Sequence, residues 1–335
     1  MFLFFKHFPY LYDSQVNKSM KKNAQFPALL SFFLLLALNI FAQAEENVTL
    51  QTDSGELFGT LLAPKNVQNP PVVLMIVGSG PTDRDGNSIA GKNNSLKFLA
   101  EALAEKGIAT LRYDKRGIAA SHAALDSVHN LRFDRWVNDA KGWVGLLKKR
   151  NQFSTITVAG HSQGALVGML AAQGGDVDKY ISIAGAGEPI NKILEKQLMA
   201  NSPIVAVAAQ PILDKLAQGE LVDTFPPMLA MLFNKPTQPF LISWMKFDPA
   251  EEIVKLNIPC LIVQGTNDLQ VKLEDAKKLH LVYPQSTLLV IDKMNHVLKE
   301  VTDDSANNYA AYRDPELPVM KELVNGISRF VQALK

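Results

Sequence analysis

A serine between two glycines is the first residue in this sequence whose type and setting could do chemistry. Residues 160–164 read GHSQG, which matches the pattern G-x-S-x-G. The apolar run TITVA at 155–159 leads into it, and ALVGMLAA at 165–172 follows it. A strand, sharp turn and helix of this kind hold a serine hydroxyl clear of the backbone. Ser162 is therefore a candidate nucleophile, and the alternative is a glycine-rich turn whose serine caps a helix.

A serine hydroxyl is a poor nucleophile until a base removes its proton, so an acid and a histidine should accompany it. In sites that follow a strand-turn-helix serine, the chain order is serine, acid, histidine. Asp268 directly follows GTN and the apolar run 261–264, which places it at the carboxyl end of an expected strand. The alternative for Asp268 is a loop carboxylate that caps an Asx turn.

The base can be chosen among six histidines by elimination. Only His280 and His296 follow Asp268, and the other four precede the acid. His280 lies within a helical pattern, AKKLHLV, where a surface or packing role fits better. His296 lies in KMNH, just past the apolar run 286–291. We therefore expect His296 to activate Ser162 and Asp268 to orient the His296 ring.

The negative charge that develops on an attacked carbonyl oxygen needs preorganised N–H donors. One donor should be the backbone N–H of Gln163, the residue after the nucleophile. The other should lie after the apolar run 72–77, where GSG at 78–80 lets the main chain approach a ligand. There we expect the N–H of Ser79. The same residues could form a plain turn, but they lack the lysine and spacing of a phosphate-binding P-loop.

Strands and helices alternate along the sequence and must position these groups. Repeated strand-helix-strand units predict an α/β fold, with a mostly parallel sheet covered by helices on both faces. Candidate residues that follow strands then meet at the carboxyl edge of the sheet, where ligands bind. We expect strands at 48–52 and 57–62 (an antiparallel hairpin), 72–77, 108–113, 155–159, 180–184, 261–264 and 286–291, and helices at 96–106, 133–147, 163–172, 273–281 and 317–334.

An insertion at 188–252 interrupts this alternation. It contains apolar helical stretches at 190–199, 204–216 and 228–233. We interpret it as a helical cap over the carboxyl edge, within a core that comprises 45–187 and 253–335.

Residues 1–44 have the pattern of an export signal. Lys21 and Lys22 precede the apolar run 26–41, and AQA follows at 42–44. A basic segment, an apolar segment and an A-x-A site in this order predict a secretory signal peptide, with cleavage after Ala44. The alternative is an uncleaved membrane anchor. The apolar run is short and interrupted compared with the length that a membrane-spanning helix needs, which favours the cleaved signal peptide. We expect a secreted or periplasmic protein with no stable membrane anchor, and residues 1–19 as an upstream extension.

Composition excludes several classes of protein. The 335 residues carry 34 Lys and Arg against 33 Asp and Glu, a net charge of +1, which argues against a nucleic-acid partner. A hydrophobic content of 47% is too high for a disordered chain. The single cysteine, Cys260, excludes a disulfide framework and a cysteine-built metal site, and its apolar setting indicates packing. No metal or cofactor is implied.

Together these residues resemble the α/β-hydrolase superfamily, over nearly all of the chain after residue 44. Their order, GTND at 265–268 and YDKRG at 113–117 are similar to its capped, lysophospholipase-like and serine-aminopeptidase-like branch. GSGPTDRDGN at 78–87 is similar to the oxyanion loop G-S-G-P-x-D-R-D of a group of bacterial esterases. Two positions depart from the pattern. Val77 replaces a common histidine, and Ala119 stands where the branch often has glycine.

The resemblance implies a serine hydrolase that cleaves small carboxylic esters through an acyl-enzyme, with small to medium acyl chains under the Met- and Leu-rich cap. An aminopeptidase or other amide hydrolase would use the same triad. It would also need an acidic pocket for a substrate amine. The insertion offers Glu188, Glu195, Asp214, Glu220 and Asp223 for that purpose. A non-catalytic binding protein of this fold is the third hypothesis, but it would not need all three candidate residues.

Four charged residues near the expected oxyanion loop complete the sequence-based site. We expect Asp83, Arg84, Asp114 and Arg116 to form an ion-pair network that braces the loops. The alternative is that one of the arginines binds a substrate carboxylate, because the guanidinium fork suits that group.

Overall fold

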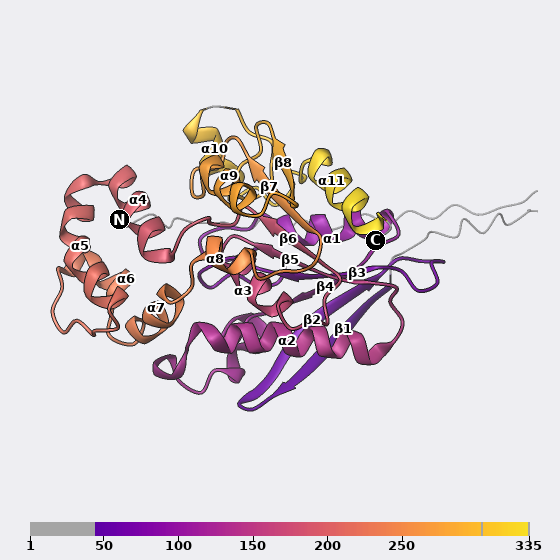
Figure 1. Cartoon of the computed structure of the whole chain (residues 1–335), viewed down its shortest axis with the longest axis horizontal. Coiled ribbons are helices and arrows are strands. Elements are labelled where there is room, and N and C mark those ends of the chain that lie inside the picture. Colours follow the sequence, from indigo (N-terminus) through magenta and orange to yellow (C-terminus); the bar gives the residue numbers. More distant parts are fainter. Residues whose placement is uncertain (1–43, 303, 334–335) are drawn as a thin grey trace, which may run out of the picture. The chain divides into compact units, whose positions relative to one another are not determined.

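The apolar runs of the chain form one eight-stranded sheet in the computed structural model, which describes residues 44–302 and 304–333. The strand order is β1-β2-β4-β3-β5-β6-β7-β8 (Figure 1). β2 pairs antiparallel with β1 and β4, and the other neighbours are parallel, so the predicted mostly parallel sheet is confirmed. The strands are β1 (Ala44–Thr52), β2 (Gly55–Ala63), β3 (Val72–Ile76), β4 (Ala109–Tyr113), β5 (Ile156–His161), β6 (Lys179–Ile183), β7 (Cys260–Gly265) and β8 (Thr287–Ile291).

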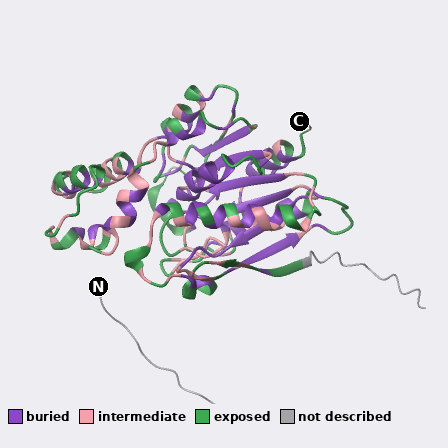
Figure 2. Cartoon of the chain, turned by 60° about the horizontal axis from the view of Figure 1, so that its bottom comes forward, coloured by how far each residue is buried: buried purple, intermediate pink, exposed green. Residues whose placement is uncertain are grey.

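Helices cover both faces of the sheet, and the central strands β3 to β7 are buried between them, whereas the outer strands β1 and β8 are partly exposed (Figure 2). α1 and α11 pack on one face, and α2, α3 and α9 pack on the other. Outside the insertion, the helices are α1 (Ser95–Glu105), α2 (Phe133–Arg150), α3 (Gln163–Ala172), α9 (Leu273–Val282), α10 (Ser305–Ala311) and α11 (Lys321–Gln332), with short 3₁₀ helices at Ala119–Ala124 and Val128–Asn130.

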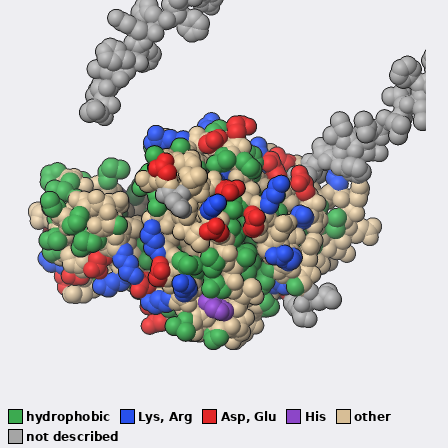
Figure 3. Space-filling view, turned by 90° about the horizontal axis from the view of Figure 1, so that it is seen from above, with side chains coloured by type: hydrophobic (Ala, Val, Ile, Leu, Met, Phe, Trp, Pro, Cys, Tyr) green, Lys and Arg blue, Asp and Glu red, His purple; other side chains and the backbone are tan. Residues whose placement is uncertain are grey.

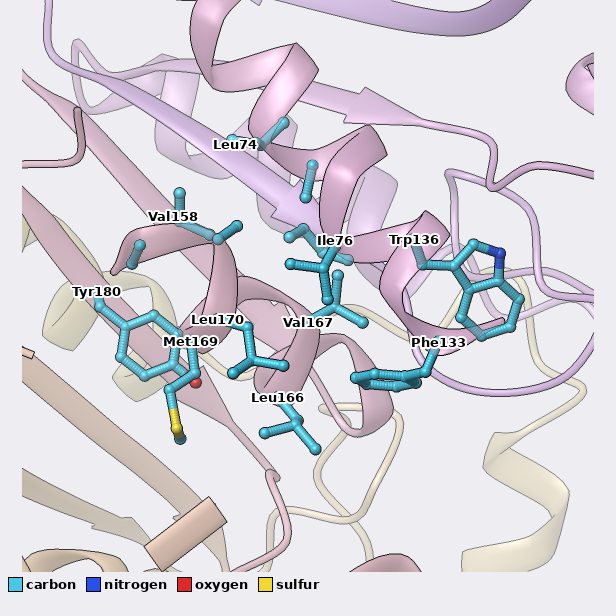
Figure 4. Close-up of a cluster of buried hydrophobic side chains, with 14 of the residues drawn as sticks. Leu74, Ile76, Phe133, Trp136, Val158, Leu166, Val167, Met169, Leu170 and Tyr180 are labelled. Atoms are coloured by element: carbon cyan, nitrogen blue, oxygen red, sulfur yellow. The ribbon is translucent and has the colours of Figure 1, made fainter. Parts of the chain in front are cut away.

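β3 shows why the central strands are continuously apolar. Leu74 and Ile76 belong to the cluster that includes α2 and α3 (Figure 4). The intervening Val73 and Met75 belong to the cluster that includes α1 and α11. Alternate side chains of a strand point to opposite faces, so a strand covered on both sides needs apolar residues at every position.

The last helix is shorter than the sequence predicts. It begins at Lys321 rather than at 317. Pro318 disfavours a helical conformation in the residue before it. Residues 318–320 instead pair with the loop after β8: Val319 bridges to Lys299, and the Met320 N–H donates to the Leu298 carbonyl at 3.0 Å. This pairing ties the start of α11 to the loop that carries His296.

The insertion between β6 and β7 is helical. Its helices form a lobe at one end of the sheet (left in Figure 1). Figure 3 shows hydrophobic side chains gathered on this lobe. Six large apolar residues of the insertion are exposed: Met199, Ile204, Val207, Leu221, Met228 and Met231. The helices are α4 (Ile190–Asn201), α5 (Pro203–Ala217), a 3₁₀ turn (Pro227–Leu229), α6 (Ala230–Phe233), α7 (Gln238–Met245) and α8 (Pro249–Ile253).

α7 forms where the sequence predicts no helix, and it attaches the lobe to the core. Pro239 lies in its first turn, where a missing N–H costs nothing. The Trp244 ring stacks on Phe133 of α2 with 5.4 Å between centroids, and the Phe133 N–H donates to Ser243 Oγ at 2.8 Å. The insertion is therefore fixed to a core helix rather than held by its two connections alone.

The predicted upstream extension and signal peptide lie outside the described residues, apart from Ala44 at the start of β1. In the described ranges, no helix is both long enough and apolar enough to cross a bilayer. The signal peptide stays a prediction.

Candidate active site

Ser162 lies in the sharp turn between β5 and α3, with φ 56° and ψ −122°. A positive φ is uncommon for serine, and such backbone strain costs about 1–3 kcal/mol. The surrounding structure holds it in place. The Ser162 N–H donates to the Ile183 carbonyl and its own carbonyl accepts from the Ala165 N–H, both at 2.9 Å. The strained elbow that the motif predicts is present.

The glycines of the motif allow this turn because the backbone passes too close for side chains. A Cβ on Gly160 would collide with the Gly164 carbonyl, and a Cβ on Gly164 would collide with the Ile76 carbonyl of β3. On the facing loop, a Cβ on Gly78 would lie 3.1 Å from the Ser162 Cβ. The two glycines of the elbow and Gly78 together bring the loop after β3 against the serine.

Asp268 and His296 form a buried hydrogen-bonded pair. His296 Nδ1 lies 2.7 Å from Asp268 Oδ2, and their side chains are 5% and 1% exposed. The other oxygen, Oδ1, accepts the N–H groups of Gln270 at 2.7 Å and Val271 at 3.0 Å. Because the carboxylate accepts the Nδ1 proton, Nε2 of the neutral ring is left as the basic nitrogen.

The environment of Asp268 keeps it ionised. Burial by itself would raise the pKa of Asp268, but the neighbouring His296 and the backbone N–H donors hold that pKa below its usual value. Gln264 in β7 also donates its Nε2 to Asp268 Oδ2 at 3.1 Å. Sequence reasoning missed Gln264, because its contact with Asp268 depends on the turn that follows β7.

His161, at the elbow, is hydrogen-bonded to the loop that carries His296. Its Nε2 lies 2.8 Å from the backbone carbonyl of His296, and the two rings lie 4.8 Å apart at their centroids. Burial, with a smaller effect from His296, lowers the pKa of His161 to about 3, so the ring is neutral and donates through Nε2–H. The sequence excludes His161 as the base, because His161 precedes Asp268, and predicts no other role for it. Its place at the end of β5, beside Ser162, is the one signal that could have indicated this contact.

Two cavities meet at Ser162. The first, of about 160 Å³, is lined by His161, His296 and Tyr312 and by the loop that follows β3. The second, of about 200 Å³, is lined by Gln163 and by apolar residues of the insertion, among them Ile190, Ile193, Leu241 and Trp244. Ser79, Ser162 and Gln270 line both cavities. A bound molecule can therefore extend to both sides of the Ser162 hydroxyl.

The two expected oxyanion donors flank this junction. Gln163 is the first residue of α3, so its N–H has no acceptor within the helix, and the helix dipole adds positive charge there. Ser79 is exposed and lines both cavities. All five residues predicted for the site are thus brought to the carboxyl edge of the sheet: Ser79, Ser162, Gln163, Asp268 and His296.

The charged residues near the loop form separate pairs rather than the single network expected. Arg84 binds Asp114 at 2.7 Å, and Arg116 binds Asp139 of α2 at 2.6 Å. Asp83 instead accepts backbone N–H groups of its own loop, from Asp85 and Asn87. Neither Arg84 nor Arg116 lines the two cavities at Ser162, so the structure does not favour an arginine that binds a substrate carboxylate.

Cys260 is buried at the start of β7, as its apolar setting predicts. Burial raises the pKa of its thiol to about 12, which leaves it protonated and unreactive. Among the described residues, no group of three or more His, Cys, Asp or Glu side chains is placed to hold a metal ion.

Comparisons with known proteins find relatives described as hydrolases. The model of a family described as serine aminopeptidase, S33, matches residues 91–228, a range that includes Ser162 but neither Asp268 nor His296. Esterase EstD of Thermotoga maritima is 29% identical over 247 residues, which cover 72% of this chain and 57% of that protein. Lipase 1 of Psychrobacter immobilis is 26% identical over 188 residues, 50% of this chain and 58% of that protein. The chain thus spans less than two thirds of these curated relatives.

Solved structures share the fold. The esterase Pf2001 of Pyrococcus furiosus superposes with a TM-score of 0.58 at 16% identity, over 87% of this chain and 91% of that one. Est1E of Butyrivibrio proteoclasticus gives a TM-score of 0.52 at 20% identity, over 79% of this chain and 96% of that one. The sheet order, the strained serine elbow and these likenesses agree with one another. The chain therefore has an α/β-hydrolase fold.

Proposed function

We propose that this chain is a serine hydrolase that cleaves carboxylic esters through an acyl-enzyme intermediate. One observation carries the proposal. Ser162, on a strained elbow, shares a cavity with His296, and the buried carboxylate of Asp268 is hydrogen-bonded to the far nitrogen of that histidine. The esterase and lipase relatives support the same activity.

The proposed mechanism gives each group a step. His296 Nε2 takes the Ser162 proton as Oγ attacks the ester carbonyl carbon, and Asp268 stabilises the imidazolium that forms. The N–H groups of Ser79 and Gln163 bind the negative oxygen of the tetrahedral intermediate. The intermediate collapses, and His296 gives its proton to the departing alcohol. Water, activated by the same histidine, then releases the acid and restores Ser162.

The second cavity supports a site for the acyl chain. Its walls are mainly apolar side chains of the insertion and of α3, including Leu166 and Trp244. At about 200 Å³ the cavity is small, which favours short to medium acyl chains. The first cavity then takes the alcohol side of the ester.

An aminopeptidase is the competing function, since the matched family is described by that activity. A free substrate amine needs an unpaired carboxylate near the serine. Of the five acidic candidates in the insertion, only Glu188 lines either cavity. Glu188 is already bound to Lys196 and to Lys278, and its bond to Lys196 lowers its pKa despite partial burial. This pairing favours an ester over an α-amine substrate.

The test is hydrolysis of a chain-length series of p-nitrophenyl esters alongside aminoacyl p-nitroanilides, with the full chain and its Ser162→Ala variant. We expect ester turnover that declines beyond medium acyl length and is lost in the variant. Full esterase activity in Ser162→Ala would overturn the mechanism. Turnover of the anilides alone would establish the aminopeptidase, and turnover of neither class would favour a non-catalytic binding protein.

We also propose that the protein is exported to the periplasm or the medium. The support is the pattern of Lys21, Lys22, the apolar run 26–41 and the small residues at 42–44. Amino-terminal sequencing of material from a fractionated producing cell should begin at Glu45. A start upstream of Met20 in a membrane fraction would instead show an uncleaved anchor.

A further inference from the structure

A buried lysine lies beneath the loop that carries the expected oxyanion donor. Lys115, two residues after β4, is 3% exposed. Its Nζ donates to the carbonyl of Gly78 at 2.6 Å and to that of Gly80 at 3.1 Å. The ammonium also lies over the Trp136 ring, 4.6 Å from the centroid. Lys115 lines neither cavity, whereas Gly78 and Ser79 line the first.

Burying a lysine without a partner carboxylate costs folding free energy. A lysine at such a position therefore suggests a specific role for its hydrogen bonds. The adjacent charged side chains are engaged elsewhere, Asp114 with Arg84 and Arg116 with Asp139. No ion pair among the described residues includes Lys115. Its burial lowers its pKa to about 7. Both the ammonium and the neutral amine have the two N–H groups that these bonds require, so the contact does not depend on one protonation state.

The carbonyl of Gly78 and the N–H of Ser79 belong to the same peptide group. In a planar trans peptide these two bonds point in opposite directions. A donor that holds the Gly78 carbonyl from beneath therefore fixes the direction of the Ser79 N–H on the opposite side. Hydrogen bonding to the carbonyl also polarises the peptide, which makes that N–H a stronger donor.

We propose that Lys115 is a positioning residue that fixes the oxyanion loop and aims the Ser79 N–H at the carbonyl oxygen attacked by Ser162. The proposal rests on the esterase function proposed above. The second bond of Lys115, to the Gly80 carbonyl, also anchors the Gly80–Pro81 peptide, so the loop is held both before Ser79 and after Gly80. Gly80 has φ +73°, a conformation that a loop without this anchor could leave at little cost.

The test compares Lys115→Met, which keeps the length of the side chain but removes the donors, with Lys115→Gln, which keeps an amide donor. Lys179→Met is the matched control. Lys179 is also buried, and its Nζ donates to three backbone carbonyls at the end of α11, away from both cavities. Each variant is made in the full chain. Wild-type and Ser162→Ala activities are measured first, so that failure of the esterase function is recognised separately.

We expect Lys115→Met to lower kcat for a p-nitrophenyl ester about 100-fold to 1,000-fold, the effect of losing one oxyanion donor, with KM nearly unchanged. The affinity for an arylboronic acid, which forms a tetrahedral adduct on the serine, should fall with kcat. Lys115→Gln should recover at least tenfold of the lost kcat. Lys179→Met should lose stability but keep kcat.

The proposal is overturned if Lys115→Met keeps kcat within threefold of wild type, or if Lys179→Met loses kcat equally. It is also overturned if kcat falls while the boronic acid binds as tightly as before. If Lys115→Met does not fold, Lys115→Leu, which also removes the donors, supplies the same comparison. A folded leucine variant with wild-type KM and reduced boronic acid affinity supports the role, and one with wild-type values for both refutes it.

Discussion

The neutral ring of His161 packs against His296 and holds its backbone carbonyl, with 2.8 Å between Nε2 and the oxygen and 4.8 Å between ring centroids. The residue beside the nucleophile thus supports the loop that carries the base. The two residues lie 135 positions apart in the chain.

His161→Phe keeps an aromatic ring but removes the donor to the His296 carbonyl. We expect kcat to fall about tenfold to 100-fold, because a base displaced by a fraction of an ångström transfers protons less well. Steady-state ester hydrolysis measures the effect. His122→Phe, at an exposed position, is the control and should leave kcat unchanged. Equal rates in both variants would show that the ring does not position the base.

His161 should also make stability depend on pH. In the unfolded chain it takes up a proton as the pH falls through about 6.5, whereas its pKa in the folded protein is about 3. The free energy of unfolding therefore decreases as the pH falls from 6.5 toward 3. Wild type should lose up to about 1.4 kcal/mol per pH unit more than His161→Phe over that range. Urea denaturation at pH 7, 6 and 5 tests this, and parallel curves for the two proteins would contradict it.

Asp268→Asn should lower kcat about 1,000-fold to 10,000-fold, because an amide favours the wrong tautomer of His296 and cannot stabilise the imidazolium. Circular dichroism should show an unchanged fold. Asp292→Asn is the control, since Asp292 is exposed and accepts a hydrogen bond from the Thr266 hydroxyl at 3.1 Å. Loss of turnover in Asp292→Asn with full turnover in Asp268→Asn would move the acid to Asp292.

Ser162→Gly and Ser162→Ala should both be inactive but should differ in stability. Glycine adopts the φ of +56° at little cost, whereas alanine keeps the strain of the serine. We expect the glycine variant to be about 1 kcal/mol more stable than the alanine variant. Thermal denaturation of the pair measures this difference. Equal melting temperatures would indicate that the elbow is relaxed.

Two glycines should respond to alanine in opposite ways. Gly160→Ala should unfold the elbow or reduce soluble yield sharply, because its Cβ would collide with the Gly164 carbonyl. Gly145, within α2, has open space around its Cβ position, so Gly145→Ala should stabilise the protein by about 0.5–1 kcal/mol. Melting temperatures of both variants test the pair. A stable Gly160→Ala enzyme would contradict the close approach at the elbow.

The sheet, the elbow and the order of the three candidate catalytic residues could all be predicted from the amino-acid sequence. These features are local, because apolar runs identify buried strands and two glycines around Ser162 identify the turn. Parallel strands end at the same edge, so Asp268 and His296 could be expected there without coordinates. Helix boundaries were less predictable. The start of α11 moved to Lys321 because the preceding residues pair with the loop after β8.

The side chains that support the site become identifiable only from the packing of the folded chain. Lys115 and Gly78 lie 37 residues apart, and Gln264 reaches Asp268 through a turn that no pattern identifies. The partners of Arg84 and Arg116 were likewise decided by packing, which placed Asp139 of α2 beside Arg116. Such contacts depend on how helices and strands pack against one another. They therefore cannot be predicted from residue types and their spacing along the chain. The candidate catalytic residues could therefore be predicted, whereas the residues that hold them in place could not.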